Sequence, residues 1–328
     1  MSQSVNFTHQ PVLAERCIAL LGQGIKQVGT EGCALVIDAT LGLGGHSELI
    51  LQTYPQVRLV GIDRDKQALA RASKRLREHS ARFTAVHATY DAIDQVAAAY
   101  SSEEYPLAGV LMDLGVSSMQ LDDTARGFSY SREADLDMRM DQSSGKTAAD
   151  LLAELSSLQL AEILRKWGEE RFASRIAREI VNVREKKPVT SSAQLVEIVR
   201  AAIPAPARRS GGNPAKRTFQ ALRIAVNQEL SILGDALPKA LQVLAPGGVL
   251  VVEAYQSLED RIVKRAFQQA VAPATLDGIP LTDPKTFQLL INGAEKAGEA
   301  EMENNPRAAS VRLRAISKLK AEAERNGE

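Results

Sequence analysis

The sequence predicts an α/β fold in which a doubly wound, mostly parallel sheet is interrupted after its fourth strand by an all-helical insertion. Apolar, β-branched runs alternate with helix-like stretches over residues 1–116, which is typical of a parallel sheet with helices on both faces. Strand signals then stop from 117 to 214, and an apolar run at 249–252 resumes the sheet. We therefore expect one discontinuous domain, 1–116 with 215–328, and an insertion domain, 117–214.

The elements of the first half follow one another at short intervals. Strands are expected at 34–40, 58–63, 83–88 and 108–114. Helices are expected between them, at 46–53, 66–79 and 91–100. The strand runs are short and rich in valine, isoleucine and leucine, as buried parallel strands are.

The second half is expected to be helical before the sheet resumes. In the insertion, leucine and isoleucine recur at helical spacing and form apolar faces. A long helical pattern runs from 218 to 244, with a break expected near Gly234 or Pro238. Nearer the C-terminus, 293–309 is expected to be a mobile loop and 310–316 an edge strand that closes the sheet, with a frayed helix after it.

The composition is that of an ordinary globular protein, with 328 residues, 45% of them hydrophobic and 24% charged. No apolar run approaches the ~20 residues of a membrane span, and the polar N-terminus has no apolar signal core. The two cysteines, Cys17 and Cys33, have no metal-ligand spacing and do not make a disulfide scaffold. We therefore expect a cytoplasmic protein without a metal site or membrane contact. Its oligomeric state is left open, a homodimer included.

The most informative segment is the glycine-rich stretch from 38 to 46, where Gly42, Gly44 and Gly45 follow the first strand. Glycines at such a turn let backbone N–H groups approach a ligand closely. A dinucleotide fingerprint would need a glycine where Ser47 stands, and a P-loop would need a following Gly-Lys-Ser/Thr. The pattern looks like the first motif of S-adenosylmethionine-dependent methyltransferases. The alternative is an ordinary strand-loop-helix corner.

Acidic residues recur at the ends of three expected strands, as Asp38, Asp63 and Asp113. The carboxyl ends of parallel strands meet at one edge of a sheet, where ligands bind. Asp63, at the end of the second strand, is placed to accept both hydroxyls of a ribose. Asp113 is placed to accept a proton or to hydrogen-bond an amine, and its alternative role is to cap the loop behind it.

Two further residues are candidates on the cofactor side. His46 stands at a helix start, where the helix dipole disfavours a protonated imidazole, so we expect a cofactor contact and not a base. Capping or packing is its alternative role. Tyr90 follows the third strand, where its ring can stack on an adenine or pack into the core.

Charge is distributed unevenly, although the formal net charge of the whole chain is zero. Residues 160–223 contain 14 Lys or Arg against 6 Asp or Glu, a net charge of +8. Such a surface can follow the phosphates of a nucleic acid, and it can equally be a solvated face. Arg208, Arg209, Lys216 and Arg217 are the basic residues by which we would test a phosphate grip.

With these residues in view, the chain resembles the RsmH (MraW) family of small-subunit ribosomal RNA cytosine-N4 methyltransferases. The matching segments cover most of the chain in order and are 9–13, 38–46, 61–65, 113–118, 120–123, 126–129, 136–141, 168–171, 217–224 and 257–264. The longest match begins with Asp-Leu-Gly-Val-Ser-Ser at 113 and ends with Leu-Asp-Met-Arg-Met-Asp at 141. The sequence departs at 253–256, where Glu-Ala-Tyr-Gln replaces a Ser-Phe-His that many members carry, and 265–309 matches poorly. A catalytic histidine is therefore not available there.

The resemblance implies a Rossmann-like, class I S-adenosylmethionine-dependent methyltransferase. It implies transfer of a methyl group from S-adenosyl-L-methionine to the N4 amine of a cytidine in 16S ribosomal RNA, near the decoding centre. The partner would be this RNA within the small ribosomal subunit, recognised by the insertion domain. The cofactor positions of the family correspond to Gly44, Gly45, His46, Asp63, Tyr90, Asp113 and Gln120.

Asp113 is the candidate catalytic residue. Cytosine N4 is a weak nucleophile because its lone pair is delocalised into the ring, so transfer needs an acceptor that hydrogen-bonds the amine. Residues 113–116 lack the Pro-Pro-aromatic sequence that DNA amino-methyltransferases often carry at this point, so that base-stacking clamp is absent. Phe128, Tyr130 and Phe219 are candidates to stack on the base, with core packing as the alternative.

Overall fold

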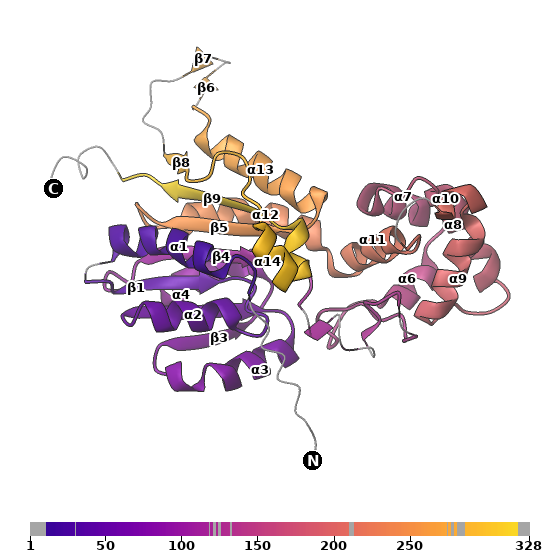
Figure 1. The fold of residues 1–328 in the computed structure, drawn as a ribbon, viewed down its shortest axis with the longest axis horizontal. Helices are drawn as coiled ribbons and strands as arrows, with labels where there is room; N and C mark the ends of the chain where they lie inside the picture. Colours follow the sequence, from indigo (N-terminus) through magenta and orange to yellow (C-terminus); the bar gives the residue numbers. More distant parts are fainter. Residues whose placement is uncertain are drawn as a thin grey trace. The chain divides into compact units, whose positions relative to one another are not determined.

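The computed structural model describes residues 11–29, 31–117, 119–120, 123, 126–131, 133–209, 213–273, 275–276, 279–280 and 286–320. The chain divides into two compact units, one formed by Met1–Gly115 with Leu230–Glu328 and the other by Val116–Glu229 (Figure 1). A helical tail was expected after residue 316, but 317 and 318 belong to the strand β9 (Arg312–Lys318), and the tail from 321 onward lies outside the described residues. None of the described helices is long and apolar enough to span a membrane.

A seven-stranded sheet lies at the centre of the first unit, in the order β3-β2-β1-β4-β5-β9-β8. Its strands are β1 (Ala34–Asp38), β2 (Val57–Asp63), β3 (Phe83–His87), β4 (Leu107–Asp113), β5 (Val249–Ala254), β8 (Phe287–Leu289) and β9 (Arg312–Lys318). The first five strands are parallel, whereas β9 is antiparallel to β5 and β8 is antiparallel to β9. The doubly wound, mostly parallel sheet predicted from the sequence is therefore confirmed. A separate two-stranded ladder joins β6 (Thr275–Leu276) to β7 (Ile279–Pro280).

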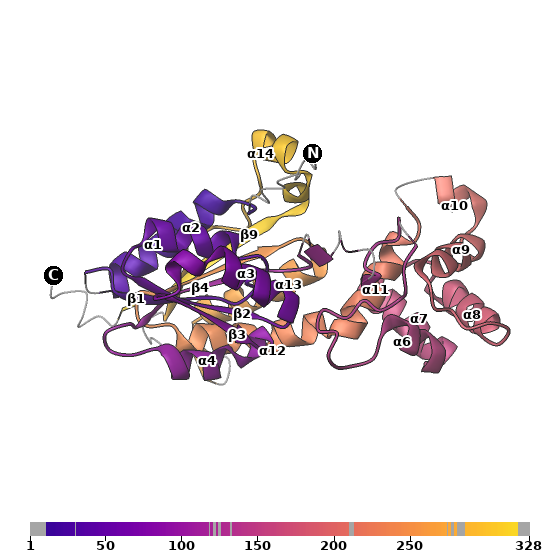
Figure 2. The same cartoon turned by 90° about the horizontal axis from the view of Figure 1, so that it is seen from below.

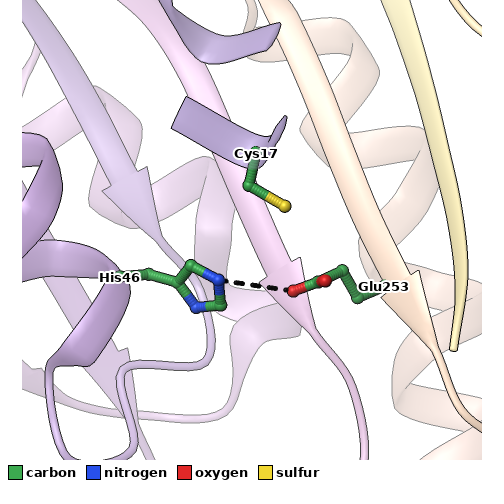
Figure 3. A group of neighbouring side chains, drawn as sticks. All are labelled: Cys17, His46 and Glu253. Atoms are coloured by element: carbon green, nitrogen blue, oxygen red, sulfur yellow. Dashed lines mark ion pairs between the residues drawn. The ribbon is translucent and has the colours of Figure 1, made fainter. Parts of the chain in front are cut away.

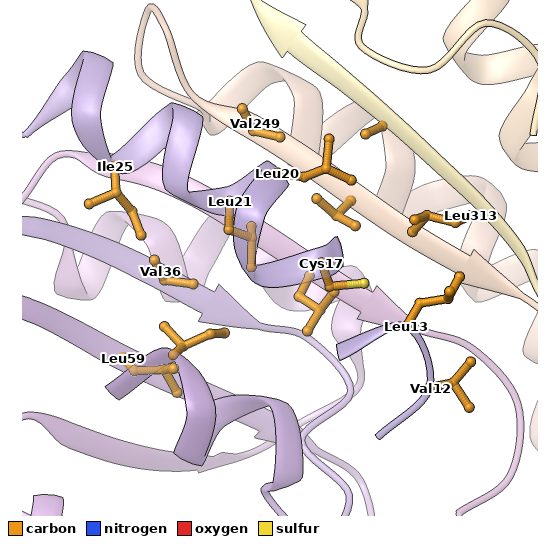
Figure 4. Close-up of a cluster of buried hydrophobic side chains, with 14 of the residues drawn as sticks. Val12, Leu13, Cys17, Leu20, Leu21, Ile25, Val36, Leu59, Val249 and Leu313 are labelled. Carbon is orange, nitrogen blue, oxygen red and sulfur yellow. The ribbon is translucent and has the colours of Figure 1, made fainter. Parts of the chain in front are cut away.

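Helices cover both faces of this sheet (Figure 2). One face carries α1 (Ala14–Val28), α2 (Gly45–Thr53) and α3 (Lys66–Arg75), and the other carries α4 (Ile93–Tyr100), α12 (Glu229–Val243) and α13 (Ser257–Val271). Val36 of β1 faces the first set of helices, and its neighbour Ile37 faces the second. Figure 4 shows the core under α1, where Leu20, Leu21 and Cys17 are buried against the strands. Short 3-10 helices are η1 (Arg77–His79), η2 (Tyr90–Ala92) and η4 (Pro306–Ser310).

The C-terminal part of the sheet differs from the sequence prediction at one strand. An edge strand was the expectation for 310–316, but β9 lies inside the sheet because β8 pairs with its outer side. β8 is too short to be recognised from its sequence pattern, so the edge assignment was wrong.

The segment 293–309, predicted to be a loop, contains a helix, α14 (Glu299–Asn304). Its acidic side chains contact the N-terminal part of the chain. The backbone N–H of Leu13 donates to Glu301 Oε1 at 2.6 Å, and Arg16 Nε lies 3.0 Å from Glu295 Oε2. Two of the glutamates in this stretch, Glu295 and Glu301, are therefore held by residues remote in sequence.

The second unit consists of helices around one hydrophobic core. They are α6 (Ala148–Glu154), α7 (Ser157–Gly168), α8 (Ala173–Arg184), α9 (Ser192–Ala202), α10 (Ala205–Arg209) and α11 (Lys216–Asn227). Three of them begin at a hydroxyl cap, because Thr147, Ser156 and Ser191 each accept a hydrogen bond from the backbone N–H three residues on. No strand occurs among the described residues of this unit, apart from an isolated bridge between Asp135 and Ser191.

The long helix expected from 218 to 244 is two helices that part at Gln228, whose φ of 53° is left-handed. The expected breaks at Gly234 and Pro238 do not occur, since both residues lie within α12.

The boundary between α11 and α12 falls where the chain passes from one hydrophobic core to the other. α11 buries Phe219 and Leu222 in the second unit, whereas α12 buries Leu233 and Leu237 beneath the sheet. The second unit consequently extends to Glu229, beyond the boundary at 214 that the sequence predicts for the insertion.

Candidate functional site

The carboxyl ends of four parallel strands lie at one edge of the sheet and carry acidic side chains. β1 and β2 end at Asp38 and Asp63. β4 ends at Asp113, which pairs in register with Glu253 of β5. Three of these acids are predicted from the sequence as strand-end residues, whereas Glu253 is not singled out as a site residue.

Asp63 supports the glycine-rich loop. Its Oδ2 accepts a hydrogen bond from Gly42 N at 2.8 Å, and its Oδ1 accepts one from Asp65 N at 2.8 Å. Burial raises the pKa of Asp63, and the two backbone N–H groups oppose that rise. The loop can take this path because Gly42 and Gly44 have left-handed φ values of 52° and 76°.

Gly45 is the next glycine of the loop, and close packing fixes its position. A Cβ on Gly45, the first residue of α2, would stand only 2.7 Å from Cγ of Pro11, so a larger residue would displace the N-terminal segment.

Asp38 is buried inside the glycine-rich loop and stabilises it by hydrogen bonds. Ser47 Oγ donates to Asp38 Oδ2 at 2.6 Å, and Thr40 N donates to Asp38 Oδ1 at 3.2 Å. Burial raises the pKa of Asp38, although the Ser47 hydroxyl opposes the rise. Ser47, which donates to Asp38, is therefore the residue that stands where a dinucleotide fingerprint would have its third glycine. Asp38 shapes the loop from within and is only 1% exposed.

Asp113 is partly open to solvent, with 31% of its side chain exposed. Its backbone N–H donates to Thr40 Oγ1 at 2.6 Å, which ties the end of β4 to the glycine-rich loop. Tyr255 Oη, from the segment after β5, donates to Asp113 Oδ1 at 2.8 Å. Burial and the Asp113 carboxylate raise the pKa of Tyr255 far above its ordinary value, so its hydroxyl stays protonated and donates.

His46 lies between Asp113 and Glu253, and Figure 3 shows the side toward Glu253. Its Nε2 is 3.1 Å from Val12 O and 3.5 Å from Glu253 Oε2, and its Nδ1 is 3.8 Å from Asp113 Oδ2. Burial lowers the pKa of His46, and the nearby Asp38 carboxylate opposes this effect. The side chain packs inward and is 6% exposed.

Glu253 and Cys17 complete this buried group. Glu253 is fully buried in β5, and Cys17 is fully buried on α1. Burial raises the pKa of both, and the nearby Asp113 carboxylate adds to the rise. Sequence reasoning missed Glu253, although an acid within the apolar run Val-Leu-Val-Val-Glu-Ala was a usable signal.

The other two predicted cofactor residues occupy different places. Tyr90 is the first residue of η2, directly after β3, and is half-buried against the core under α4 and α12. Gln120 belongs to the second unit, where its Oε1 accepts a hydrogen bond from Ser117 N at 3.1 Å. It is 4% exposed.

The three aromatic candidates for base stacking contact the core of the second unit. Phe128 and Phe219 are 7% and 3% exposed, and Tyr130 meets Phe219 edge-on with ring centroids 5.9 Å apart. Core packing is thus the role that the structure gives them.

Comparison with known proteins gives the family. The MraW methylase family matches residues 6–319. A protein of Beutenbergia cavernae named ribosomal RNA small subunit methyltransferase H is 54% identical, over 95% of this chain and 93% of its own length. Proteins with the same name are 52% identical in Mycobacterium avium, over 98% and 84% of the two chains, and 53% identical in Frankia alni, over 94% and 95%. A match over nearly the whole chain, together with the sheet and its glycine-rich loop, shows that the chain belongs to the MraW methylase family.

Proposed function

We propose that this methyltransferase moves a methyl group from S-adenosyl-L-methionine to the N4 amine of a cytidine in 16S ribosomal RNA. The observation that carries the proposal is Asp113, a partly exposed carboxylate held by Tyr255 and joined through Thr40 to the glycine-rich loop. An acceptor beside a cofactor loop is what methylation of an amine requires.

The residues of the first unit fit this cofactor, which when bound supplies an electrophilic methyl group. A Cβ on Gly42 would have no heavy atom nearer than Thr40 O at 3.8 Å, so a ligand can approach the loop closely there. The Asp63 carboxylate keeps lone pairs for ribose hydroxyls, because each oxygen accepts a single backbone N–H. Gly44, Gly45 and His46 would bound the pocket at the start of α2.

Two further cofactor residues are proposed from the resemblance to the family. Tyr90 would stack on the adenine, and Gln120 would add a polar contact to the cofactor. Both side chains are consistent with such roles in type, since an aromatic ring stacks and an amide donates and accepts.

Asp113 would hold the cytosine amine. The Tyr255 hydroxyl fixes the orientation of the carboxylate, so an amine N–H can be drawn toward it as the nitrogen becomes pyramidal. The carboxylate would then take up the proton that the amine loses. The cytosine must be unstacked to reach this edge of the sheet, as with other enzymes that modify bases.

The RNA substrate is proposed from the names of the relatives and from the charge of the second unit. Relatives that are 52–54% identical are named ribosomal RNA small subunit methyltransferases. Residues 160–223 carry a net charge of +8, with exposed Arg165, Lys166, Lys186 and Lys187 among them. We propose that this surface holds the RNA through its phosphates, with the RNA folded in the small ribosomal subunit.

The decisive experiment uses small ribosomal subunits and naked 16S RNA, both taken from cells that lack this enzyme. Each is incubated with the purified protein and isotopically labelled S-adenosylmethionine, and methylated nucleotides are mapped by mass spectrometry. We expect one N4-methylated cytidine with the subunit, formed at a rate at least about 100-fold lower with the Asp113→Asn variant. A label on cytosine C5, on ribose or on ribosomal protein would contradict the proposal, as would the absence of label from both substrates.

A further inference from the structure

Three buried side chains with metal-binding atoms meet in the first unit, from three distant parts of the sequence. Cys17 lies on α1, His46 on α2 and Glu253 on β5 (Figure 3). Cys17 Sγ, one imidazole nitrogen of His46 and one carboxylate oxygen of Glu253 all lie within 4.8 Å of one another. The three side chains point toward a common centre in Figure 3.

Glu253 is the member of this group that lacks a strong partner. It is fully buried, and among the described residues neither of its carboxylate oxygens accepts a hydrogen bond from a nitrogen or hydroxyl donor. The thiol of Cys17 next to it is only a weak donor. A buried carboxyl group in such surroundings is costly unless a cation or a proton compensates it.

From this geometry we propose that Cys17, His46 and Glu253 bind a zinc ion, at a site next to the proposed methyl-transfer site because His46 also faces Asp113. A thiolate, an imidazole nitrogen and a carboxylate are the ligand types that zinc takes in proteins, whereas magnesium and calcium prefer oxygen alone. Ligand atoms on a tetrahedral zinc stand about 3.3–3.6 Å apart, given bond lengths of about 2.0–2.3 Å. The 3.5 Å between His46 Nε2 and Glu253 Oε2 matches that separation.

The charges of the site also balance. A zinc dication would replace the thiol proton of Cys17 and the carboxyl proton of Glu253, which pass to solvent. With a neutral imidazole, the ion and its ligands then have no net charge, which suits a buried position.

The outer side of His46 fits a zinc ligand as well. Metal-bound histidines usually direct their second ring nitrogen at a carboxylate or carbonyl group. With zinc on Nε2, the proton of His46 would reside on Nδ1, which faces Asp113 Oδ2 at 3.8 Å. Val12 O, now 3.1 Å from Nε2, would lose that hydrogen bond. A water molecule would occupy the fourth zinc position.

The test measures metal directly and needs no activity assay. The full-length protein is purified without an affinity tag or chelator, and its zinc is counted by mass spectrometry. The metal is then removed and Co²⁺ added, because cobalt bound to a thiolate gives a sulfur-to-metal charge-transfer band. Cys17→Ser and Glu253→Gln remove ligands. Cys33→Ser is the matched control, since Cys33 is the other cysteine of the chain and lies outside the cluster.

We expect one zinc per chain and a charge-transfer band in the wild type and in Cys33→Ser. Cys17→Ser should lose the band, and Glu253→Gln should lose most of the bound zinc. A folded wild type with neither zinc nor the cobalt band would overturn the proposal and leave Glu253 as a buried protonated acid. Zinc retained in Cys17→Ser would overturn it too. If a ligand variant fails to fold, the wild-type and Cys33→Ser spectra still decide the question.

Discussion

Each unit of the chain buries a polar side chain, Asn227 in the second unit and Glu253 in the first, and the two side chains differ in how they are paired. In the second unit, Asn227 donates to Met138 O at 2.7 Å and accepts from Met140 N at 2.8 Å. In the first unit, Glu253 is buried without a comparable donor. Buried polar groups that are hydrogen-bonded stabilise the loop they hold. A buried polar group without such partners lowers the stability of the fold, and groups of this kind are often found at binding or catalytic sites.

The two units therefore should respond differently to the loss of a polar side chain. Substitutions at the sheet edge should change reaction or ligand binding, and substitutions in the helical unit should change folding. Trp167, the only tryptophan of the chain, lies on α7 and reports on the second unit alone by its fluorescence.

The largest effect is expected for Asp113→Asn. The amide keeps the shape of the carboxylate but cannot take a proton from the amine, so kcat should fall by about 100-fold or more, or about 2.7 kcal/mol in barrier height. Methyl transfer is measured at saturating cofactor and ribosomal substrate. Tyr255→Phe, which removes only the orienting hydrogen bond, should cost less. A wild-type rate for Asp113→Asn would rule out the acceptor role. A changed unfolding transition in the fluorescence of Trp167 would mean that a substitution in the first unit also affects the folding of the second.

The next effect is one of stability and belongs to the second unit. Arg139 Nε and Nη2 donate to the two oxygens of Asp137 at 2.7 and 2.9 Å, and both side chains are largely buried. Arg139→Met should lower the free energy of unfolding by about 1–3 kcal/mol, followed by Trp167 fluorescence in urea. Lys146→Met is the control, because Lys146 and Glu154 form an exposed ion pair that should contribute little. Equal losses in both variants would contradict the prediction.

The same pair predicts a dependence on pH. Partial burial acts to raise the pKa of Asp137, but the hydrogen bonds from Arg139 and Gln142 outweigh it and leave this pKa lowered. A lowered pKa means that the stabilisation is complete above the unfolded pKa of about 3.9 and is lost as pH falls through the folded value. The stability difference between wild type and Arg139→Met should therefore be constant near neutral pH and shrink below about pH 4. A constant difference down to strongly acidic pH would assign the effect to packing.

A smaller effect is expected for cofactor affinity. Asp63→Ala removes the acceptor for the ribose hydroxyls and the acceptor for the backbone N–H of Gly42. S-adenosylmethionine should therefore bind at least about tenfold more weakly, a loss of about 1.4 kcal/mol in binding free energy. Calorimetric titration measures this. Glu78→Ala, which removes an exposed acid of η1, should bind as the wild type does. Unchanged affinity in folded Asp63→Ala would exclude Asp63 from the cofactor site.

The smallest effect concerns the charge of the second unit. Lys216 and Arg217 are exposed on α11, and their reversal to glutamate should weaken RNA binding and reduce its salt slope by about 1–2. The same reversal of Lys264 and Arg265, exposed on α13 of the first unit, is the matched control. If the two double variants respond alike across a salt series, the basic stretch has no special part in RNA binding. Cofactor affinity should be unchanged in the Lys216/Arg217 variant.

Much of the first unit could be predicted from the sequence because its signals are local. A strand of apolar residues that ends in an acid and a glycine turn places Asp63 and Asp113 without knowledge of the rest of the chain. Asp38 shows the limit of such reasoning. Its position at a strand end was predicted correctly, but its side chain accepts hydrogen bonds from Ser47 and Thr40 inside the loop.

The features that sequence reasoning missed depend on partners distant in the chain. Cys17, His46 and Glu253 are brought together by three different elements, so a search for metal-ligand spacing along the sequence could not find them. The helix boundary at Gln228 was missed because Gly234 and Pro238 are stronger local signals. The boundary depends instead on which core each helix is buried in.

The place of β9 in the sheet also sets an order of events during synthesis. β5 pairs with β4 on one side and with β9 on the other, and β9 comes from residues 312–318 near the end of the chain. Translation proceeds from the N-terminus, so the helical unit emerges complete while β5 still has an open edge. An open edge is a template for wrong pairing with other chains. The strand that carries Glu253 thus gains this second neighbour only after residues 312–318 have been made, and a product that stops before β9 would present an open, aggregation-prone sheet edge.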